Sequence, residues 1–344
     1  MSVSGRWQVE RGAFRPRGIR WEPFATGSTN RLWRGTGPSG DWLLKWYKYP
    51  AAGVHPEPEV GRFLRDHGFS GVPEFGARLD RWGAEGFETV AYVQRWVPGR
   101  AAWEVAVEGL RAGHCLRQWA AGLGRRVGEL HAALASAKDD AEHAFAPMPH
   151  SDRLHEAWVD RVRAVCERLE DALRNEPPRG APADVWAEAR SLWLGRGARW
   201  RDRLGLLRSL RVSALCSRIH GDLHLGQILQ AATTAGVPEW WVVDFEGEPL
   251  RLLEERRAPD LPLRDVAGMW RSFEYAAATA GVSSESALPL QAAFLEGWRE
   301  RMPVPGGDWR ALLDALVWEK SVYEALYEIE HRPGWLWIPL RALA

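Results

Sequence analysis

The sequence predicts an α+β fold with two lobes, a small strand-rich N-terminal lobe and a larger, mainly helical C-terminal lobe. Three observations lead to this prediction. The chain has 344 residues, about twice the length of an ordinary domain. Strand-like runs occur before residue 98, and helical periodicity dominates after residue 103. Pro98-Gly99 separates the two regions, so we expect lobes at residues 1–97 and 98–344.

The N-terminal lobe is expected to contain two strands and one helix. Runs rich in aromatic and β-branched residues predict strands at 42–47 and 89–97. Between them, residues 59–67 carry apolar side chains on one helical face, and Gly68 ends that helix. Pro50 to Pro58 breaks the pattern between the first strand and this helix.

The C-terminal lobe is expected to be helical around one short β element. Helical periodicity occurs at 116–134, 154–173, 183–210, 263–280, 285–301 and 309–331. Residues 228–230 and 240–243 are short and apolar, and we expect them to pair as a hairpin.

Polar motifs flank this hairpin. His220-Gly-Asp-Leu-His-Leu-Gly-Gln227 precedes it and Asp244-Phe-Glu246 follows it. Phosphoryl transfer needs a carboxylate near the attacking hydroxyl, and oxygen ligands that hold magnesium against the phosphates. Asp222 suits the first role, and Gln227 with Asp244 the second, at the spacing of a kinase catalytic loop. The alternative is a polar loop whose Asp and His residues only satisfy each other. His220 is expected to fix the loop by a hydrogen bond rather than to transfer protons.

A kinase also needs a cation on the nucleotide phosphates. Lys45 lies in the middle of a predicted strand, and Glu59 on the following helix is its expected partner. The alternative is an edge-strand lysine that faces solvent. Ser28 and Thr29, in the turn at 26–30, are expected to contact phosphates, although a plain hairpin turn has the same composition.

The segment from Gln94 to Val97, which includes Trp96, is expected to link the lobes and to bind adenine through backbone groups.

Acceptor residues are expected on the last long helix. Lys320, Tyr323 and Tyr327 fall at i, i+3 and i+7, which is one face of a helix, and suit a sugar with hydroxyl edges and apolar faces. Equally, the tyrosines could pack in the core while Lys320 pairs with a neighbouring glutamate. Trp335 is a further candidate as a stacking platform, and Glu246 could contact the acceptor or a magnesium-bound water.

The bulk composition excludes several classes of protein. The formal net charge is zero, with 45 basic and 45 acidic residues, which argues against a nucleic-acid or membrane-surface partner. Three cysteines without metal-ligand spacing argue against a disulfide framework or a zinc site. With no secretory signal and no long apolar run, we expect a cytoplasmic enzyme.

Together these motifs resemble the aminoglycoside phosphotransferase and choline kinase superfamily, which has a protein-kinase-like fold, and within it the bacterial maltokinases. The segments that carry the resemblance are Leu44–Tyr47, Pro56–Leu64, His220–Gln227, Asp244–Pro249, Pro262–Met269, Arg271–Tyr275, Glu319–Glu324 and Arg332–Trp335. The resemblance implies ATP and Mg²⁺ as cofactors, Asp222 as catalytic base, and Gln227 and Asp244 as metal ligands. For a maltokinase the reaction is maltose plus ATP to maltose 1-phosphate.

Two alternatives remain open for the acceptor and the activity. Lys45 lies early in the chain, and the N-terminal cap that precedes the nucleotide lobe of maltokinases is expected to be absent, which weakens the case for maltose. A kinase of an amino sugar or aminoglycoside, such as glucosamine, would need acidic residues, which Glu246, Glu248, Glu324 and Glu328 could supply. A catalytically inactive, kinase-like binding module would require a broken lysine, base or metal residue.

Overall fold

The computed structural model describes residues 6–24, 30–50, 52–84, 86–137, 144–195, 199–232, 238–248 and 251–343. The chain forms two compact units, Met1–Val105 with Arg126–Ala146 and His220–Ala258 (unit 1), and Ala106–Arg125 with Pro147–Ile219 and Pro259–Ala344 (unit 2). The units are discontinuous in sequence. The lobe boundary at 97/98 stays a prediction, but strand β7 (Arg100–Ala101) belongs to unit 1, because it pairs with β11 (Ile228–Ala232).

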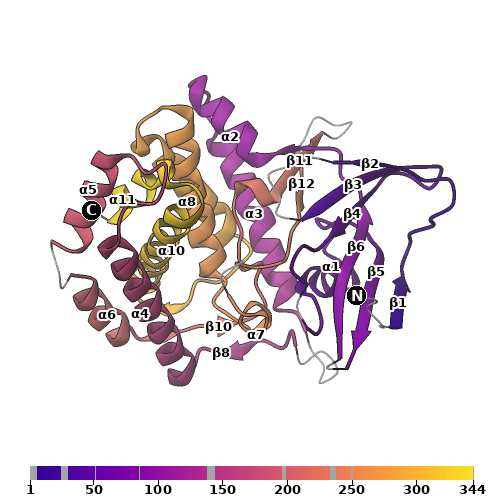
Figure 1. Cartoon of the computed structure of the whole chain (residues 1–344), viewed down its shortest axis with the longest axis horizontal. Coiled ribbons are helices and arrows are strands. Elements are labelled where there is room, and N and C mark those ends of the chain that lie inside the picture. The colour runs from indigo at the N-terminus through magenta and orange to yellow at the C-terminus, as the bar shows by residue number, and fades with distance from the viewer. Residues whose placement is uncertain are drawn as a thin grey trace. The chain divides into compact units, whose positions relative to one another are not determined.

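Unit 1 is built on a six-stranded antiparallel sheet with the strand order β1-β5-β6-β4-β3-β2 (Figure 1). The strands are β1 (Arg6–Arg11), β2 (Arg20–Pro23), β3 (Arg31–Thr36), β4 (Trp42–Trp46), β5 (Phe75–Gly83) and β6 (Gly86–Arg95). The two predicted strands are β4 and β6, which are neighbours in the middle of the sheet. Trp42 of β4 is fully buried and packs with Ala77 and Val93, against Phe14 and Trp21.

Helix α1 (Pro56–Asp66) begins three residues before the predicted start at 59. Pro56 occupies the first helical turn, where a missing N–H costs nothing and the fixed φ of proline suits a helix. His55 caps the helix, because its Nδ1 accepts from the Glu57 N–H at 3.3 Å. Pro56 and Pro58, which the sequence pattern placed before the helix, therefore lie in its first turn.

Unit 2 is helical. Its helices are α4 (Asp152–Arg174), α5 (Ala183–Trp193), α6 (Arg199–Ser209), α8 (Leu263–Ala280), α9 (Leu288–Arg299), α10 (Trp309–His331) and α11 (Trp337–Leu343), while α2 (Ala102–Arg111) and α3 (Arg117–Leu134) contribute to both units. The predicted bounds of α8 and α10 are confirmed. The single helix predicted at 183–210 is wrong, because the chain forms α5 and α6 instead.

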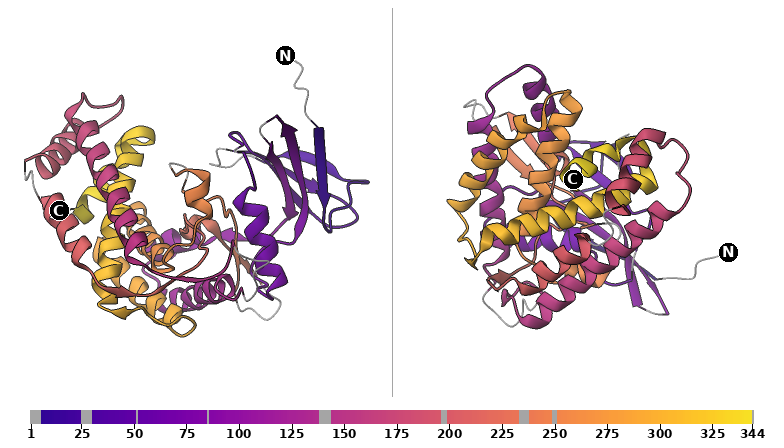
Figure 2. Two further views of the ribbon diagram at one scale, coloured as in Figure 1. Left: turned by 90° about the horizontal axis from the view of Figure 1, so that it is seen from below. Right: turned by 90° about the vertical axis from the view of Figure 1, so that its left-hand side faces the viewer.

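Helix α10 is central to unit 2, since it packs against α4, α8 and α11 (Figure 2). A buried carboxylate ties three of these helices together. Glu319 of α10 accepts from Trp158 Nε1 of α4 at 2.7 Å and from Arg264 Nη1 of α8 at 2.8 Å. Two-stranded pairs complete the unit, namely β8 (Met148–Pro149) with β10 (Leu215–Cys216) and β9 (Val212–Ser213) with β13 (Gly306–Gly307).

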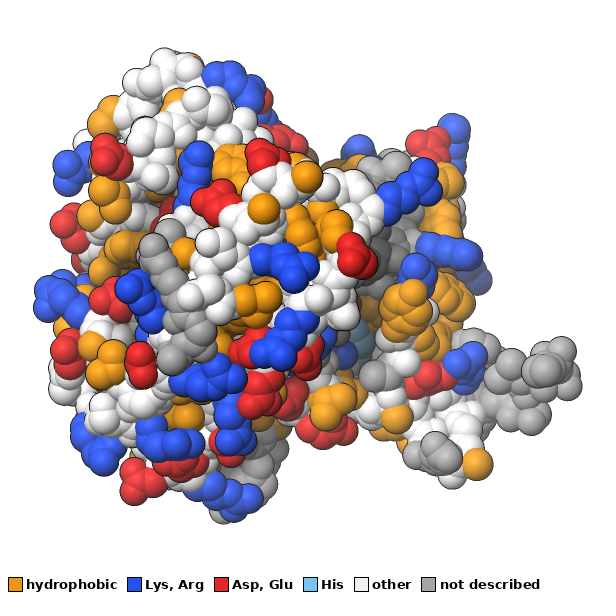
Figure 3. Space-filling model, turned by 60° about the vertical axis from the view of Figure 1, so that its left-hand side comes forward, with side chains coloured by type: hydrophobic (Ala, Val, Ile, Leu, Met, Phe, Trp, Pro, Cys, Tyr) orange, Lys and Arg blue, Asp and Glu red, His pale blue; other side chains and the backbone are white. Residues whose placement is uncertain are grey.

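The surface agrees with the neutral composition. On the face shown in Figure 3, Lys and Arg side chains are interspersed with Asp and Glu. Within the described residues, no helix is long and apolar enough to cross a membrane.

Candidate active site

The predicted hairpin is present and places the metal-binding candidates side by side. Strand β11 pairs antiparallel with β12 (Pro238–Val242), and Ile228 lies opposite Val242. This register brings the residues that flank the hairpin together, and the Val243 N–H donates to the Gln227 carbonyl at 3.0 Å. As a result, Gln227 Nε2 donates to Asp244 Oδ2 at 2.9 Å.

Asp244 has an unusual backbone conformation. Its φ of 70° makes it the one non-glycine residue with positive φ in the described part of the chain. This left-handed region disfavours most side chains, although Asp tolerates it better than bulky residues, and such strain is often found at functional sites. The turn ends the hairpin and directs the Asp244 carboxylate toward Lys45, with which it forms an ion pair.

His220 fixes the loop that carries Asp222. Its Nε2 lies 2.9 Å from the Val243 carbonyl, and the Asp222 N–H donates to its Nδ1 at 3.3 Å. Because a carbonyl only accepts, Nε2 carries the proton and Nδ1 is the acceptor. The imidazole therefore joins the loop to the end of the hairpin, which confirms the predicted supporting role of His220.

Lys45 is buried and surrounded by carboxylates. It projects from β4, is 6% exposed, and pairs with Glu57 Oε1 and Glu246 Oε1 at 2.9 Å each, in addition to Asp244. The solvent-facing edge-strand alternative is therefore wrong. We call Lys45, Glu57, Asp244 and Glu246 the lysine cluster.

The predicted helix partner of Lys45 is wrong by two residues. Glu57 makes the pair, whereas Glu59 pairs with Arg257 at 2.7 Å. Successive helical residues turn by about 100°, so residues two apart point about 200° away from each other. Because α1 begins at Pro56, Glu57 already lies in its first turn and faces Lys45. A proline-started helix was the sequence signal that could have identified Glu57.

Two further side chains, which the sequence did not identify, form hydrogen bonds to members of the lysine cluster. Tyr47 donates from its hydroxyl to Glu57 Oε2 at 2.7 Å and stacks on His55 with ring centroids 3.8 Å apart. Asn30 Nδ2 donates to Glu246 Oε1 at 2.6 Å, while its Oδ1 accepts from the Lys48 N–H at 3.1 Å. The predicted phosphate contacts Ser28 and Thr29 lie outside the described residues.

Burial and charge shift the pKa values of the lysine cluster strongly. Burial alone would lower the pKa of Lys45, but Asp244, Glu57 and Glu246 outweigh it and hold that pKa well above its usual value. Burial would raise the pKa of Asp244, but Lys45 holds it below its usual range. Burial, helped by the nearby carboxylates, raises the pKa of Glu57 and brings that of Glu246 to about 8.

The lysine cluster fits a divalent cation. The carboxylate oxygens of Glu57, Asp244 and Glu246 lie within 4.8 Å of one another. Such hard oxygen donors are those that Mg²⁺ prefers. Burial is the main cause that raises the pKa of Glu246, and the carboxylates of Asp244 and Glu57 add to it, so a cation bound here would favour the ionised form of Glu246. Gln227 donates from Nε2 to Asp244, which leaves its carbonyl oxygen as the atom that would hold a cation.

The predicted adenine-binding segment lies at the end of β6. Gln94 is buried in the strand opposite Leu43. The Trp96 N–H donates to the Asp41 carbonyl at 3.0 Å, and its indole lies edge-on to Phe24 with centroids 4.9 Å apart. An adenine contact from the Trp96 N–H would require this bond to open, and the adenine-binding role of the segment stays a prediction.

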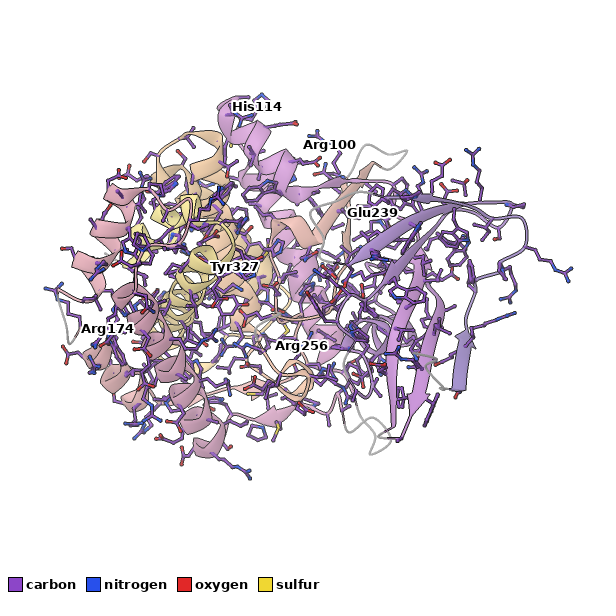
Figure 4. The ribbon with its side chains drawn as sticks, viewed as in Figure 1. Arg100, His114, Arg174, Glu239, Arg256 and Tyr327 are labelled. Carbon is purple, nitrogen blue, oxygen red and sulfur yellow. The ribbon has the colours of Figure 1, made fainter. Side chains whose placement is uncertain are left out.

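The four predicted acceptor residues of the C-terminal region lie in unit 2. Lys320 Nζ lies 4.9 Å from the centroid of the Tyr323 ring on α10. Tyr327, also on α10 (Figure 4), and Trp335 lie on either side of Arg332, whose guanidinium carbon is 5.5 Å and 5.1 Å from their ring centroids. The fifth acceptor candidate, Glu246, belongs to the lysine cluster in unit 1.

Acidic and basic side chains border these aromatic residues. Glu328 Oε1 accepts from Tyr275 at 3.1 Å and from Arg332 at 2.6 Å, and the fully buried Arg271 donates to Glu324 at 2.8 Å. Tyr275 and Arg271 belong to α8, and the sequence did not identify them as partners of these glutamates.

A strand lysine paired with a helix glutamate, beside an Asp that follows a catalytic-loop hairpin, is the arrangement of a kinase-like phosphotransferase. Residues 20–304 match the phosphotransferase enzyme family (APH), and the chain belongs to this family. The predicted superfamily and the predicted phosphotransferase activity on an alcohol group are thereby confirmed.

Two curated relatives resemble most of the chain. The chain is 29% identical over 323 residues to a glucosamine kinase of Mycolicibacterium smegmatis, and the match covers 88% of this chain and 74% of the relative. It is 28% identical over 327 residues to a glucosamine kinase of Streptacidiphilus jiangxiensis, covering 86% and 67%. A solved glucosamine kinase in complex with glucosamine, ADP and inorganic phosphate has a TM-score of 0.73 at 24% identity, covering 98% of this chain and 81% of that one. This likeness confirms the predicted kinase-like α+β fold.

Proposed function

We propose that the chain is an ATP- and Mg²⁺-dependent kinase that phosphorylates a hydroxyl group of an amino sugar, with glucosamine as the first candidate. The observation that carries the proposal is that both curated relatives are glucosamine kinases and resemble more than four-fifths of the chain. Maltose, favoured by the resemblance of Gln227 and the Glu246–Pro249 run to maltokinases, is the second candidate. The inactive binding module is disfavoured, because the lysine, base and metal residues are all present.

Different residues of unit 1 have different roles in the proposed phosphoryl transfer. Lys45 binds the nucleotide phosphates, and Glu57 orients its ammonium group. Asp244 and Gln227 would hold Mg²⁺, which supplies positive charge against the phosphates when bound. Asp222 accepts the proton of the acceptor hydroxyl as that oxygen attacks the γ-phosphorus, and the bond between this phosphorus and ADP breaks.

An amino sugar carries an ammonium group, which needs a carboxylate partner. Glu328 is suited to this role, because its Oε2 is buried and has no hydrogen-bond partner among the described residues. A buried oxygen left without a donor is energetically costly, and an ammonium group would satisfy it. Burial raises the pKa of Glu328 and Arg332 opposes this shift, so a second cation would stabilise the ionised form further. Trp335, stacked on Tyr275 with centroids 6.4 Å apart, offers an apolar ring face nearby.

The experiment is an ATP-consumption assay of the purified full-length chain with glucosamine, N-acetylglucosamine, glucose, maltose and an aminoglycoside. We expect the highest kcat/KM for glucosamine. N-acetylglucosamine, which lacks the charge, should be the poorer acceptor of this matched pair. A higher kcat/KM for maltose than for glucosamine would overturn the proposal in favour of the second candidate.

Replacing Glu328 by Gln tests the recognition of the ammonium group. In E328Q we expect the KM for glucosamine to rise about tenfold, the loss of a typical charge-assisted contact, with a much smaller change for glucose. Glu330→Gln is the matched control, since Glu330 lies on the same helix and pairs with Arg168 at the surface. Equal effects of E328Q on both sugars would assign Glu328 to packing rather than to ammonium binding.

A further inference from the structure

Helix α7 (Leu253–Arg257), which follows the lysine cluster in sequence, carries two consecutive arginines with contacts in different parts of unit 1. Arg257 makes a two-pronged bond to Glu59 of α1, with Nη2 to Oε1 at 2.7 Å and Nε to Oε2 at 3.2 Å. Arg256 (Figure 4) donates from Nη1 to the Glu246 carbonyl at 3.1 Å. The two contacts therefore reach helix α1 and the loop 244–248.

Each of these two contacts is made close to a residue whose carboxylate pairs with Lys45. Glu59 lies on the side of α1 opposite Glu57. Arg257 therefore binds one face of the helix through Glu59, while Glu57 on the other face pairs with Lys45. Arg256 holds the backbone of Glu246, whose carboxylate is another partner of Lys45. One short helix is thus bonded to both elements that supply carboxylates to the lysine cluster, helix α1 and the loop 244–248.

The geometry makes these contacts stronger than ordinary surface pairs. A two-pronged arginine–carboxylate bond fixes orientation as well as distance. The side chains of Arg257 and Glu59 are only 31% and 15% exposed, so solvent screens the pair less than it would an exposed one. At Gly247, a Cβ would lie 3.1 Å from Arg256 Cγ, so the loop packs closely on the stem of this arginine.

We propose that Arg256 and Arg257 are positioning residues that hold α1 and the loop 244–248 on Lys45 at the same time. Neither arginine need touch the nucleotide or the acceptor. Loosening either contact lets Glu57 or Glu246 move away from Lys45, so the phosphate-binding ammonium group loses its fixed position. The proposal rests on the phosphotransferase activity, but not on the identity of the acceptor.

The kinetic test compares Arg257→Gln, Glu59→Gln and the double variant, with the best acceptor of the screen above. We expect kcat to fall about 10- to 100-fold in each single variant, the effect of misplacing a catalytic group by about an ångström. The KM for the acceptor should change by less than about twofold, because the contact supports the chemical step. The double variant should be no worse than either single variant, since both remove the same bond. Arg257→Lys, which keeps the charge but not the two-pronged geometry, should recover only part of kcat.

The matched control is Arg62→Gln. Arg62 lies on α1, as Glu59 does, but it pairs with Glu10 of β1 rather than with a residue of α7. Its kcat should stay within about twofold of the parent value, as for an ordinary surface pair. An R62Q variant as impaired as R257Q would show that any ion pair of α1 matters through helix stability alone, and would overturn the proposal.

A second measurement does not depend on the acceptor. The chain has four lysines, Lys45, Lys48, Lys138 and Lys320, so modification by an amine reagent such as trinitrobenzenesulfonate can be assigned by peptide mass spectrometry. Lys45 should react several-fold faster in R257Q and E59Q than in the parent, while the exposed Lys48 reacts equally in all variants. Unchanged Lys45 reactivity in folded R257Q would overturn the proposal. A parent enzyme that is inactive on glucosamine but shows this reactivity change would overturn only the proposed acceptor.

Discussion

Replacing Asp222 by Asn is expected to lower kcat by about 1,000-fold or more, at the upper range for the loss of a general base together with its charge. Asparagine has the same shape but cannot accept the proton of the attacking hydroxyl. The loop itself should survive, because it is held by the backbone N–H of Asp222 on His220 Nδ1, and by His220 on the Val243 carbonyl. The loss should therefore be one of chemistry rather than of folding.

The measurement is the rate of single-turnover phosphoryl transfer. As controls, the affinity for ADP is measured by calorimetry and the thermal midpoint of unfolding is determined, and both should match the parent values. Asp152→Asn repeats the same chemical change at an exposed position in the first turn of α4 and should leave kcat unaltered. If D222N retained a tenth of the parent activity, another group would have to take the proton.

The residues around the hairpin could be placed from the sequence because local pairing positions them. Gln227 and Asp244 flank β11 and β12, and an antiparallel hairpin necessarily brings its two flanks together. The long helices α8 and α10 were equally predictable, since their apolar periodicity runs unbroken between clear ends.

Other parts of the site depend on contacts between distant segments, which periodicity does not report. Asn30 meets Glu246 across 216 residues, and Glu59 meets Arg257 across 198. The choice between Glu57 and Glu59 depended on where α1 begins. Prolines in a first helical turn look in the sequence like a loop.

Short strands and helix breaks were missed for a different reason. Strand β2 is mostly exposed, with one half-buried residue, so it lacks the regular alternation that identifies a strand with one buried face. Helices α5 and α6 both have helical composition, and Gly195, after the last turn of α5, was too weak a signal to separate them.

Replacing Lys45 by Met is the second large perturbation, and it should affect both activity and stability. We expect kcat/KM to fall about 100-fold or more, because the positive charge aimed at the phosphates is lost. ADP should bind more weakly for the same reason. Three carboxylates within 4.8 Å of one another would then lack their shared counter-ion, and removal of one partner from a buried ionic group costs about 3–5 kcal/mol.

The stability loss should depend on pH in a defined direction. Burial already raises the pKa of Glu57 and Glu246, and removing Lys45 raises both further. Folded K45M then binds more protons than the unfolded chain above the usual carboxyl pKa of about 4.3, so its free energy of unfolding falls as pH rises. Urea denaturation at pH 5.5 and pH 8 should show the larger deficit at pH 8.

Lys48→Met separates this effect from the general loss of a lysine. Lys48 lies three residues along the chain, is exposed, and its ammonium lies over Tyr49 at 5.0 Å from the ring centroid. K48M should match the parent protein at both pH values. If K45M were as stable as the parent at pH 8, the three carboxylates would not need Lys45 as their counter-ion. The negative charge that makes the lysine cluster suitable for a divalent cation would then have to be balanced by other groups.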